Sequence, residues 1–517
     1  MNNLSPMMRR INKPSSGRFN IPKKGRIRFV LALLLIAAGV YFGPSFFSDK
    51  SGDNTEKTKM SSKNITVKKE KSAAREITSE KRKKPEKAKK EIKVKEKKIR
   101  EKPIKEKRVR EGRIWKRKAR NKGEAQIQPE VKKVRGQLNF EDVQKLIRQH
   151  GLDINSPEQT IVTDKDTLTL SLSIDTNLQR YANRLLRRYK PRYGAIAAID
   201  PVTGRVLAFA SYSNEGESIT DTNLYLKSIF PAASVFKTIT AAAGIEKGGM
   251  NRKSQIPHFG GNHTLYRSQL QENLRVKRYI SLEESYAYSI NPTFARIALF
   301  TINKDDLTDY GNRFGFNAPV PFELDNEISV MLEPDSMFSI AEFASGFNRQ
   351  TSISPLFGAL IASAVSEYGL VPRPTIIDNI HSNKRDTVVY NRPAEPWRRA
   401  VKEPTAKELK WLMTKVPHYG TARNTFRQLR NNQRFTGYEF GGKTGNVNKQ
   451  GLGRVDWFVG FGRHPQDKNQ RIAVGVVTTH GDFWTVQSSY ISSELIRRYL
   501  TGAQARTRLT ESAAVKD

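Results

Sequence analysis

The sequence predicts an α+β fold built around an antiparallel sheet, and three runs of residues support this prediction. The run YGAIAAIDPVTGRVLAFAS, residues 193–211, holds two apolar segments joined by turn residues around Asp200-Pro201, which is the pattern of a hairpin. Residues 440–464 and 471–480 indicate three further strands separated by glycine-rich turns. Because the hairpin leads into a helix instead of into alternating βαβ units, an antiparallel sheet is favoured.

That helix is predicted in PAASVFKTITAAAGIEKGG, residues 231–249, with Ser234 in its first turn. Phe236, Ile239 and Ala243 recur at the spacing of one buried helical face, and Gly248-Gly249 marks the end of the helix. Lys237 follows Ser234 by one helical turn, so its amine can reach the hydroxyl and pair a weak nucleophile with a base. Unpaired N–H groups in a first turn also favour developing negative charge. A bare S-x-x-K is expected by chance in a chain of 517 residues, so the pair needs further support.

The flanking segments fit the same fold class. They are an amphipathic helix that ends at Gly151 inside a short ordered lead-in of residues 136–165, a strand at 167–175, a helix at about 176–189, and a helix from Ser354-Pro355 to Gly369. In SLEESYAYSINPTFARIALF, the change of pattern at Pro292 predicts a turn between two helices. This turn would present Ser289 and Asn291 as side chains.

The formal net charge of +39 is concentrated before the predicted folded part. Residues 1–28 carry +8 and residues 61–135 carry +20, whereas residues 136–517 carry only +11. A charge of this size alone would be typical of a nucleic-acid-binding protein. Because the folded part holds so little of it, we do not expect nucleic acid as a partner.

Residues 29–47 are predicted to be a transmembrane anchor, because FVLALLLIAAGVYFGPSFF carries no charge and is long enough to cross a bilayer as a helix. Tyr41, Phe42 and Pro44 stand where a signal-peptide cleavage site would need small residues. The basic residues 1–28 place the N-terminus in the cytoplasm by the positive-inside rule. The catalytic part is therefore expected on the periplasmic or extracellular side.

Residues 48–135 are predicted to be a disordered linker rich in Lys and Glu. From Glu86 to Glu111 a glutamate recurs every five residues, a period that matches neither a helix nor a strand. No single face can then bury the apolar residues between the glutamates. The segment is either a self-repelling spacer or a site for an anionic cell-envelope polymer.

The chain contains no cysteine, which excludes disulfides, Cys-ligated zinc and thiol catalysis. The seven histidines show no paired spacing typical of a metal site. We expect neither a metal nor another cofactor.

Three motifs in order, Ser234-x-x-Lys237, Ser289-x-Asn291 and Lys443-Thr444-Gly445, resemble the penicillin-binding protein and serine β-lactamase superfamily. The flanking text GRVLAFAS, HYGTARN and KTGNVNKQGLGRVDWFVGF is similar to penicillin-binding protein transpeptidase domains. The resemblance implies a penicillin-recognising transpeptidase domain over residues 166–503, with a mostly helical subdomain beside the sheet. Residues 504–517 would be a C-terminal tail.

The resemblance also implies catalytic roles for five residues. Ser234 would attack the D-Ala-D-Ala carbonyl of a peptidoglycan stem peptide, and a neutral Lys237 would take its proton. Ser289 would pass a proton to the leaving group, and Asn291 would bond to Lys237 and to the substrate amide. Lys443 would depress the pKa of Lys237 and attract the substrate carboxylate.

On the strand that follows, Thr444 and Gly445 would line the bound substrate, and the backbone N–H groups of Ser234 and Asn446 would form the oxyanion hole. Many relatives carry Thr or Ser where this chain has Asn446. The amide of Asn446 can still donate to a carboxylate, but the hydroxyl that serves β-lactam binding in those relatives is absent.

The resulting prediction is a membrane-anchored serine D,D-transpeptidase that joins a stem peptide to an acceptor amine and is acylated by β-lactams. A D,D-carboxypeptidase would use the same residues, and a non-catalytic β-lactam sensor or scaffold would share the fold. The sequence does not separate a transpeptidase from a carboxypeptidase or an endopeptidase. We find no pattern for a glycosyltransferase domain between the anchor and the predicted catalytic domain.

Overall fold

The computed structural model describes residues 137–214, 223–272 and 278–514, with side chains up to residue 505. All of them belong to the unit formed by Arg120–Asp517. The predicted tail, anchor and linker at residues 1–135 lie outside the described residues. Within the described ranges, no helix is both long and apolar enough to cross a membrane.

The central sheet has five antiparallel strands in the order β13-β14-β15-β3-β4. Its members are β3 (Tyr193–Ile199), β4 (Val206–Ser213), β13 (Glu439–Lys449), β14 (Gly453–Arg463) and β15 (Arg471–His480). The predicted hairpin and the three predicted C-terminal strands are therefore confirmed. Strand β13, which carries the Lys443-Thr444-Gly445 motif, forms one edge of the sheet.

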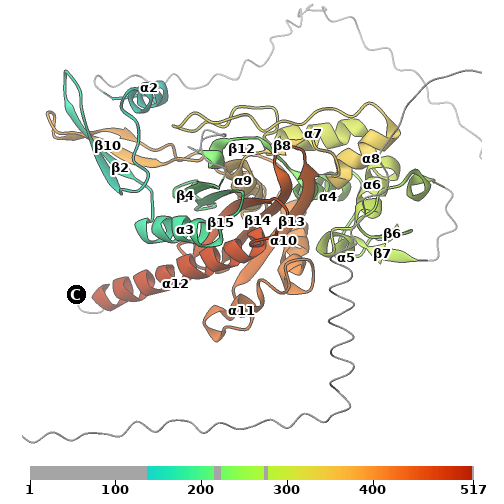
Figure 1. The fold of residues 1–517 in the computed structure, drawn as a ribbon. Helices are drawn as coiled ribbons and strands as arrows, with labels where there is room; N and C mark the ends of the chain where they lie inside the picture. Colours follow the sequence, from blue (N-terminus) through green and yellow to red (C-terminus); the bar gives the residue numbers. More distant parts are fainter. Residues whose placement is uncertain (1–136, 215–222, 273–277, 515–517) are drawn as a thin grey trace, which may run out of the picture. The chain divides into compact units, whose positions relative to one another are not determined.

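Helices cover both faces of this sheet (Figure 1). Helix α9 (Pro355–Ser366) packs on one face, where Gly358 lies against Val459 and Gly475. Helices α3 (Thr176–Tyr189) and α12 (Ser488–Ala514) pack on the other face, as shown by the contact of Gly462 with side chains of α12. A Cβ on Gly475 would lie 2.0 Å from the carbonyl oxygen of Pro355, so only glycine lets α9 approach this closely.

Two of these helices differ in length from the prediction. Helix α9 begins as expected, with the Ser354 hydroxyl accepting from the Phe357 N–H at 3.1 Å, but it ends at Ser366 before the predicted Gly369. Helix α12 continues to Ala514, so most of the expected C-terminal tail is helical. Residues 515–517 lie outside the described part.

A mostly helical subdomain lies beside the β13 edge, as predicted (Figure 1). It contains α4 (Lys237–Glu246), α5 (Leu282–Ala287), α6 (Asn291–Phe300), α7 (Lys304–Phe314) and α8 (Met337–Ser345). Helix α10 (Glu403–His418) packs on β13, α4, α5 and α9, and so joins the subdomain to the sheet. The short α11 (Arg427–Arg430) follows it.

The predicted strand at 167–175 belongs to a separate four-stranded sheet and ends at Leu172. This sheet has the order β1-β2-β10-β11 and consists of β1 (Glu158–Val162), β2 (Thr167–Leu172), β10 (Ile377–Ser382) and β11 (Thr387–Asn391). The lead-in helix is α2 (Phe140–His150), capped by Asn139 and followed by Gly151 as predicted. Three short pairs complete the strands: β5 (Phe230–Pro231) with β8 (Ser352–Ile353), β6 (Gln255–Pro257) with β7 (Tyr279–Ser281), and β9 (Leu370–Val371) with β12 (Arg398–Arg399).

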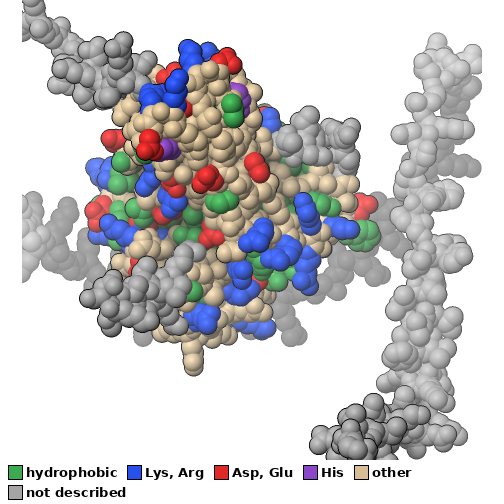
Figure 2. Space-filling model, turned by 90° about the vertical axis from the view of Figure 1, so that its left-hand side faces the viewer, with side chains coloured by type: hydrophobic (Ala, Val, Ile, Leu, Met, Phe, Trp, Pro, Cys, Tyr) green, Lys and Arg blue, Asp and Glu red, His purple; other side chains and the backbone are tan. Residues whose placement is uncertain are grey.

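Basic and acidic side chains are both scattered over the face seen in Figure 2, with only local groups of one sign. This mixture agrees with the modest charge of +11 that the sequence assigns to residues 136–517.

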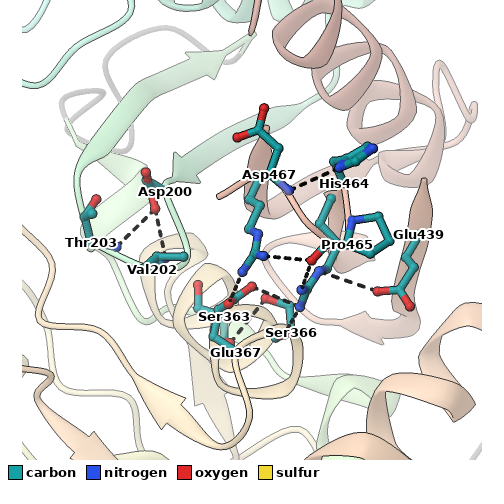
Figure 3. A network of polar contacts seen from close by, with 12 residues as sticks. Asp200, Val202, Thr203, Ser363, Ser366, Glu367, Glu439, His464, Pro465 and Asp467 are labelled. Atoms are coloured by element: carbon teal, nitrogen blue, oxygen red, sulfur yellow. Dashed lines mark hydrogen bonds and ion pairs between the residues drawn. The ribbon is translucent and has the colours of Figure 1, made fainter. Parts of the chain in front are cut away.

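A buried ion-pair cluster fixes the end of α9 against β14 and β15 (Figure 3). The Glu367 carboxylate lies 2.7 Å from Arg471 Nη1 and 3.3 Å from Arg463 Nη1, and both arginines are almost fully buried. Burial raises the pKa of Glu367, although both guanidinium groups oppose that rise. Glu439 lies 3.5 Å from Arg463 Nε and supplies a second carboxylate.

We predict that Glu367→Ala lowers the free energy of unfolding by about 3–5 kcal/mol, because it leaves two buried guanidinium groups without their shared carboxylate. Urea denaturation of the purified protein measures this change. The matched control is Asp325→Ala, which removes the exposed ion pair with Arg148 and should leave the urea midpoint unchanged. Equal midpoints for the two variants would contradict the importance of the cluster.

Candidate active site

Ser234 lies in a 3-10 turn, Ala233–Phe236, that directly precedes α4. The sequence predicted Ser234 in the first turn of the α-helix, and this detail is wrong, because α4 begins at Lys237. Ala233 has a φ of 48° in the left-handed region, so no α-helix can run through it, and the chain makes one tighter 3-10 turn before α4. The serine and the lysine nevertheless remain one turn apart.

The backbone is strained on both sides of this site. Ala233 and Ser289 adopt φ values of 48° and 58°, which cost about 1–2 kcal/mol for each L-residue. Gly346, after α8, lies close to the first of these residues, and no side chain would fit there, since a Cβ on Gly346 would lie 1.9 Å from the Ala233 carbonyl oxygen. Strain of this kind persists only where surrounding packing fixes the conformation, and it is typical of functional sites.

The Lys237 amine is fully buried and contacts three oxygen atoms. Its Nζ lies 2.7 Å from Ser234 Oγ, 2.7 Å from Asn291 Oδ1, and within hydrogen-bond distance of the Ser345 carbonyl oxygen. A neutral amine has two N–H donors and one lone pair. When the amide and the carbonyl accept those two hydrogens, the lone pair is left facing the Ser234 hydroxyl. The site therefore positions Lys237 as a proton acceptor.

Electrostatics favour that neutral form. Burial holds the pKa of Lys237 well below its ordinary value of 10.5, and the positive charge of Lys443 lowers it further. Burial also lowers the pKa of Lys443, to about 7. The expected influence of Lys443 on Lys237 is thus present, but burial is the larger cause.

The turn between α5 and α6 brings Ser289 and Asn291 to the same place, as the sequence predicted. The Asn291 amide donates from Nδ2 to the His263 carbonyl oxygen at 3.0 Å, which turns its Oδ1 towards Lys237. The Ser289 hydroxyl accepts from Lys443 Nζ at 2.8 Å. Each of the two lysines is therefore paired with one serine hydroxyl.

Strand β13 contributes residues in alternation. Lys443 and Gly445 are buried on the side of the Ser234 turn, whereas Thr444 and Asn446 are more exposed. A Cβ on Gly445 would lie 3.3 Å from the Ser234 nitrogen, so the strand backbone runs beside Ser234. Thr444 bonds through its hydroxyl to that of Thr421 at 2.6 Å.

These residues surround an open cleft of about 360 Å³. Its lining contains the predicted Ser234, Ser289, Asn291, Thr444, Gly445 and Asn446. The two lysines are not part of the lining, because they lie buried beneath it and reach it through the serine hydroxyls. Within the described ranges, no three His, Asp or Glu side chains gather closely enough to hold a metal ion.

Several residues of the site were not predicted. Thr421, Arg454, Asp456 and Trp484 line the cleft, and the Ser345 carbonyl completes the shell of Lys237. Thr421 lies in the segment HYGTARN, which contributed to the family resemblance, but the sequence assigned no chemical role to it. Arg454 and Asp456 could have been predicted only from the pairing of β13 with β14, which brings both residues close to Asn446. The sequence alone does not give the register of that pairing.

Comparison with known proteins identifies the family that the sequence motifs resemble. A family model described as the penicillin-binding protein transpeptidase domain matches residues 194–501. Stage V sporulation protein D of Bacillus subtilis is 26% identical over 321 residues, which cover 57% of this chain and 48% of that protein. The peptidoglycan D,D-transpeptidase PbpA of Mycolicibacterium smegmatis is 23% identical over 253 residues, which cover 43% of this chain and 50% of that protein. The chain thus spans about half the length of the curated relatives it matches.

Among solved structures, the imipenem acyl-enzyme complex of penicillin-binding protein A from M. tuberculosis superposes with a TM-score of 0.53 at 21% identity. The match covers 64% of this chain and 79% of that one, and it shows a shared fold. With the family model matching more than half of the sequence, the chain belongs to the family of proteins with a penicillin-binding protein transpeptidase domain.

Proposed function

We propose that the chain is a serine D,D-transpeptidase that cross-links peptidoglycan stem peptides through an acyl-enzyme on Ser234. One observation carries this proposal: the buried Lys237 amine contacts the Ser234 hydroxyl at 2.7 Å, while the oxygens of Asn291 and Ser345 can accept its two N–H groups. This arrangement suits a base that activates a serine nucleophile. The matched relatives and structures, which include a peptidoglycan D,D-transpeptidase and a β-lactam acyl-enzyme complex, support the same reaction class.

In the proposed acylation, Ser234 Oγ attacks the carbonyl carbon between the two terminal D-alanines while its proton passes to Lys237 Nζ. The negative charge that develops on the carbonyl oxygen would be stabilised by the backbone N–H groups of Ser234 and Asn446. Such an oxyanion hole agrees with the close approach of the strand at Gly445 to the Ser234 nitrogen.

Collapse of the tetrahedral intermediate breaks the C–N bond, and the leaving amine of the terminal D-alanine takes a proton. Ser289 is the proposed donor, since its hydroxyl is bonded to Lys443 at 2.8 Å and can be reprotonated from that side. An acceptor amine then attacks the ester carbonyl, which forms the cross-link as the C–O bond to Ser234 breaks. Lys237 returns its proton to Ser234 Oγ, and the proton that the amine loses passes through Ser289 to Lys443. With a β-lactam the same attack opens the ring, and the amine stays attached to the acyl group.

The proposal extends to the N-terminal part of the chain. The uncharged stretch at residues 29–47, preceded by +8 on residues 1–28, supports a membrane anchor with the catalytic domain outside the cytoplasm. Residues 48–135 would then act as a spacer, or bind an anionic cell-envelope polymer, between the membrane and the domain.

We predict that Ser234→Ala abolishes covalent labelling by a fluorescent penicillin and leaves the thermal unfolding temperature unchanged, because it removes one hydroxyl without adding bulk. Mass spectrometry of the labelled wild-type protein should place the adduct on Ser234. Labelling of the variant at the wild-type rate would disprove the nucleophile. With a D,D-peptide and an amine, wild-type protein should release the peptide–amine product, whereas release of the shortened peptide alone would indicate a carboxypeptidase.

A second prediction concerns the acid limb of the pH profile of acylation. Below about pH 7 Lys443 is charged, and this charge helps to keep Lys237 unprotonated. Lys443→Met removes that charge, so the pKa of Lys237 rises and the residual acylation rate falls off at a higher pH than in wild type. Lys449→Met, at the end of the same strand, should leave the profile in place. An acid limb that stays fixed, or moves to lower pH, in Lys443→Met contradicts the coupling.

The third prediction tests the proposed topology. Protease added outside spheroplasts should cut residues 48–135 and release a soluble fragment that begins near residue 136 and still binds fluorescent penicillin. A protein that stays intact until the membrane is permeabilised would place the domain on the cytoplasmic side instead. Cleavage within a cytoplasmic marker protein reports leaky cells and serves as the control.

A further inference from the structure

Arg454 stands at the rim of the cleft in a position that no motif predicts. It lies on β14 opposite Asn448 of β13, its side chain is exposed, and it is part of the cleft lining. Its Nε donates to Asn446 Oδ1 at 3.1 Å. The guanidinium carbon lies 4.3 Å from the centre of the Trp484 ring, which is a favourable distance for a cation–π contact.

Two contacts fix the Trp484 ring on which the guanidinium group of Arg454 lies. The Trp484 ring stacks on His480 with a centroid distance of 5.2 Å, and its Nε1 donates to the Val486 carbonyl oxygen at 2.9 Å. Burial and the nearby Arg454 lower the pKa of His480 to about 4, so the ring beneath Trp484 is neutral at physiological pH. The guanidinium group therefore rests on a fixed platform.

The carboxylate nearest to this group is already used by the protein. Asp456 is buried, accepts from the Ser488 N–H at 2.6 Å, and also interacts with the Asn446 amide. Among the described residues no carboxylate forms an ion pair with Arg454. Its two terminal nitrogens, which have the fork geometry that matches a carboxylate, are thus left for a ligand.

The two lysines are poorly suited to hold a carboxylate. Both are fully buried beneath the lining and bonded to serine hydroxyls. Burial lowers the pKa of both amines, that of Lys443 to about 7, so neither keeps a full charge through the physiological pH range, whereas an arginine does. Arg454 is therefore the permanent cation among the described residues that line the cleft.

We propose that Arg454 binds the free carboxylate of the acyl donor, namely the terminal carboxylate of a D,D-peptide or the ring carboxylate of a β-lactam. This proposal rests on the proposed function of the site. Asn446 is a positioning residue, because its amide oxygen accepts from Nε of Arg454 and so leaves the two terminal nitrogens of this cleft-lining side chain for the ligand. The sequence suggested that Lys443 and the Asn446 amide attract the carboxylate directly. We assign this role to Arg454 instead.

The test compares a ligand that has the carboxylate with the same ligand that lacks the charge. We expect Arg454→Gln in the full-length protein to lower the second-order rate of acylation by benzylpenicillin about 10- to 100-fold, the usual effect of losing a charge-assisted pair. Acylation by benzylpenicillin methyl ester should change less than about 3-fold, because the ester offers no charge to lose. A D,D-peptide with a free or an amidated C-terminus should show the same contrast.

Three further variants sharpen the test. Arg349→Gln removes an exposed cation that donates to the Asn448 carbonyl oxygen at 2.8 Å but does not line the cleft, so it should change neither rate. Arg454→Lys keeps the charge without the fork and should fall between wild type and Arg454→Gln. Asn446→Ala should weaken the reaction of the free acid only, and this loss should disappear in the Arg454→Gln background.

An equal loss for acid and ester in Arg454→Gln would show that the residue supports the structure of the cleft, and would overturn the proposal. So would a variant that reacts with both ligands at the wild-type rate. If wild-type protein is acylated by neither ligand, the proposed function itself fails, and the role of Arg454 fails with it. The three outcomes are distinguished by the wild-type measurement and by the ratio of acid to ester.

Discussion

The burial of two lysine amines is the constraint on which the rest of the site depends. Moving an ammonium group out of water costs several kcal/mol unless partners or loss of the proton offset the cost. Around Lys237 and Lys443 both compensations are present, since hydroxyl and carbonyl oxygens surround each amine and burial lowers both pKa values. The site thus obtains a base at neutral pH from the same packing that forms the core.

That packing ties four distant parts of the sequence to one point. The turn before α4 and the end of α8 each supply one contact to the Lys237 amine, through Ser234 and Ser345. The α5–α6 turn supplies one contact to each amine, and strand β13 carries Lys443 itself. Their approach is closer than ordinary side chains permit, as the contact of Gly346 with the Ala233 carbonyl shows. The left-handed conformations of Ala233 and Ser289 are the local strain that this convergence imposes, and the surrounding core stabilises them.

The sequence predicted the parts of the fold that depend on local pattern. Alternation and turn residues identified the hairpin and the three C-terminal strands. The motifs identified the hydrogen-bond partners of the two amines except the Ser345 carbonyl, and they missed the Phe294 and Tyr286 rings beside these amines. Local pattern could not show that β2 pairs with β10, because paired residues such as Leu170 and Ile380 lie about two hundred positions apart in the sequence. It also could not place Ser234 in a 3-10 turn, since nothing in the local sequence marks Ala233 for a positive φ, and the close approach of Gly346 to Ala233 is a tertiary contact. The anchor and linker at residues 29–135 remain predictions.

A lysine that is neutral enough to accept a proton from serine cannot at the same time be a lasting positive charge for a substrate. In the proposed mechanism different residues carry the two tasks, because the burial that lowers the pKa of Lys237 also lowers that of Lys443 and removes part of its charge. Arg454 has the opposite environment, exposed to solvent and supported by the face of Trp484, where its charge costs little to keep. This explains why Asn446 suits a position where many relatives carry a hydroxyl residue. The amide oxygen of Asn446 accepts from Nε of the guanidinium group, whereas the shorter side chain of Ser or Thr reaches less far. On this view Asn446 and Arg454 form one unit, and the chemistry of carboxylate binding follows from separating permanent charge from proton transfer.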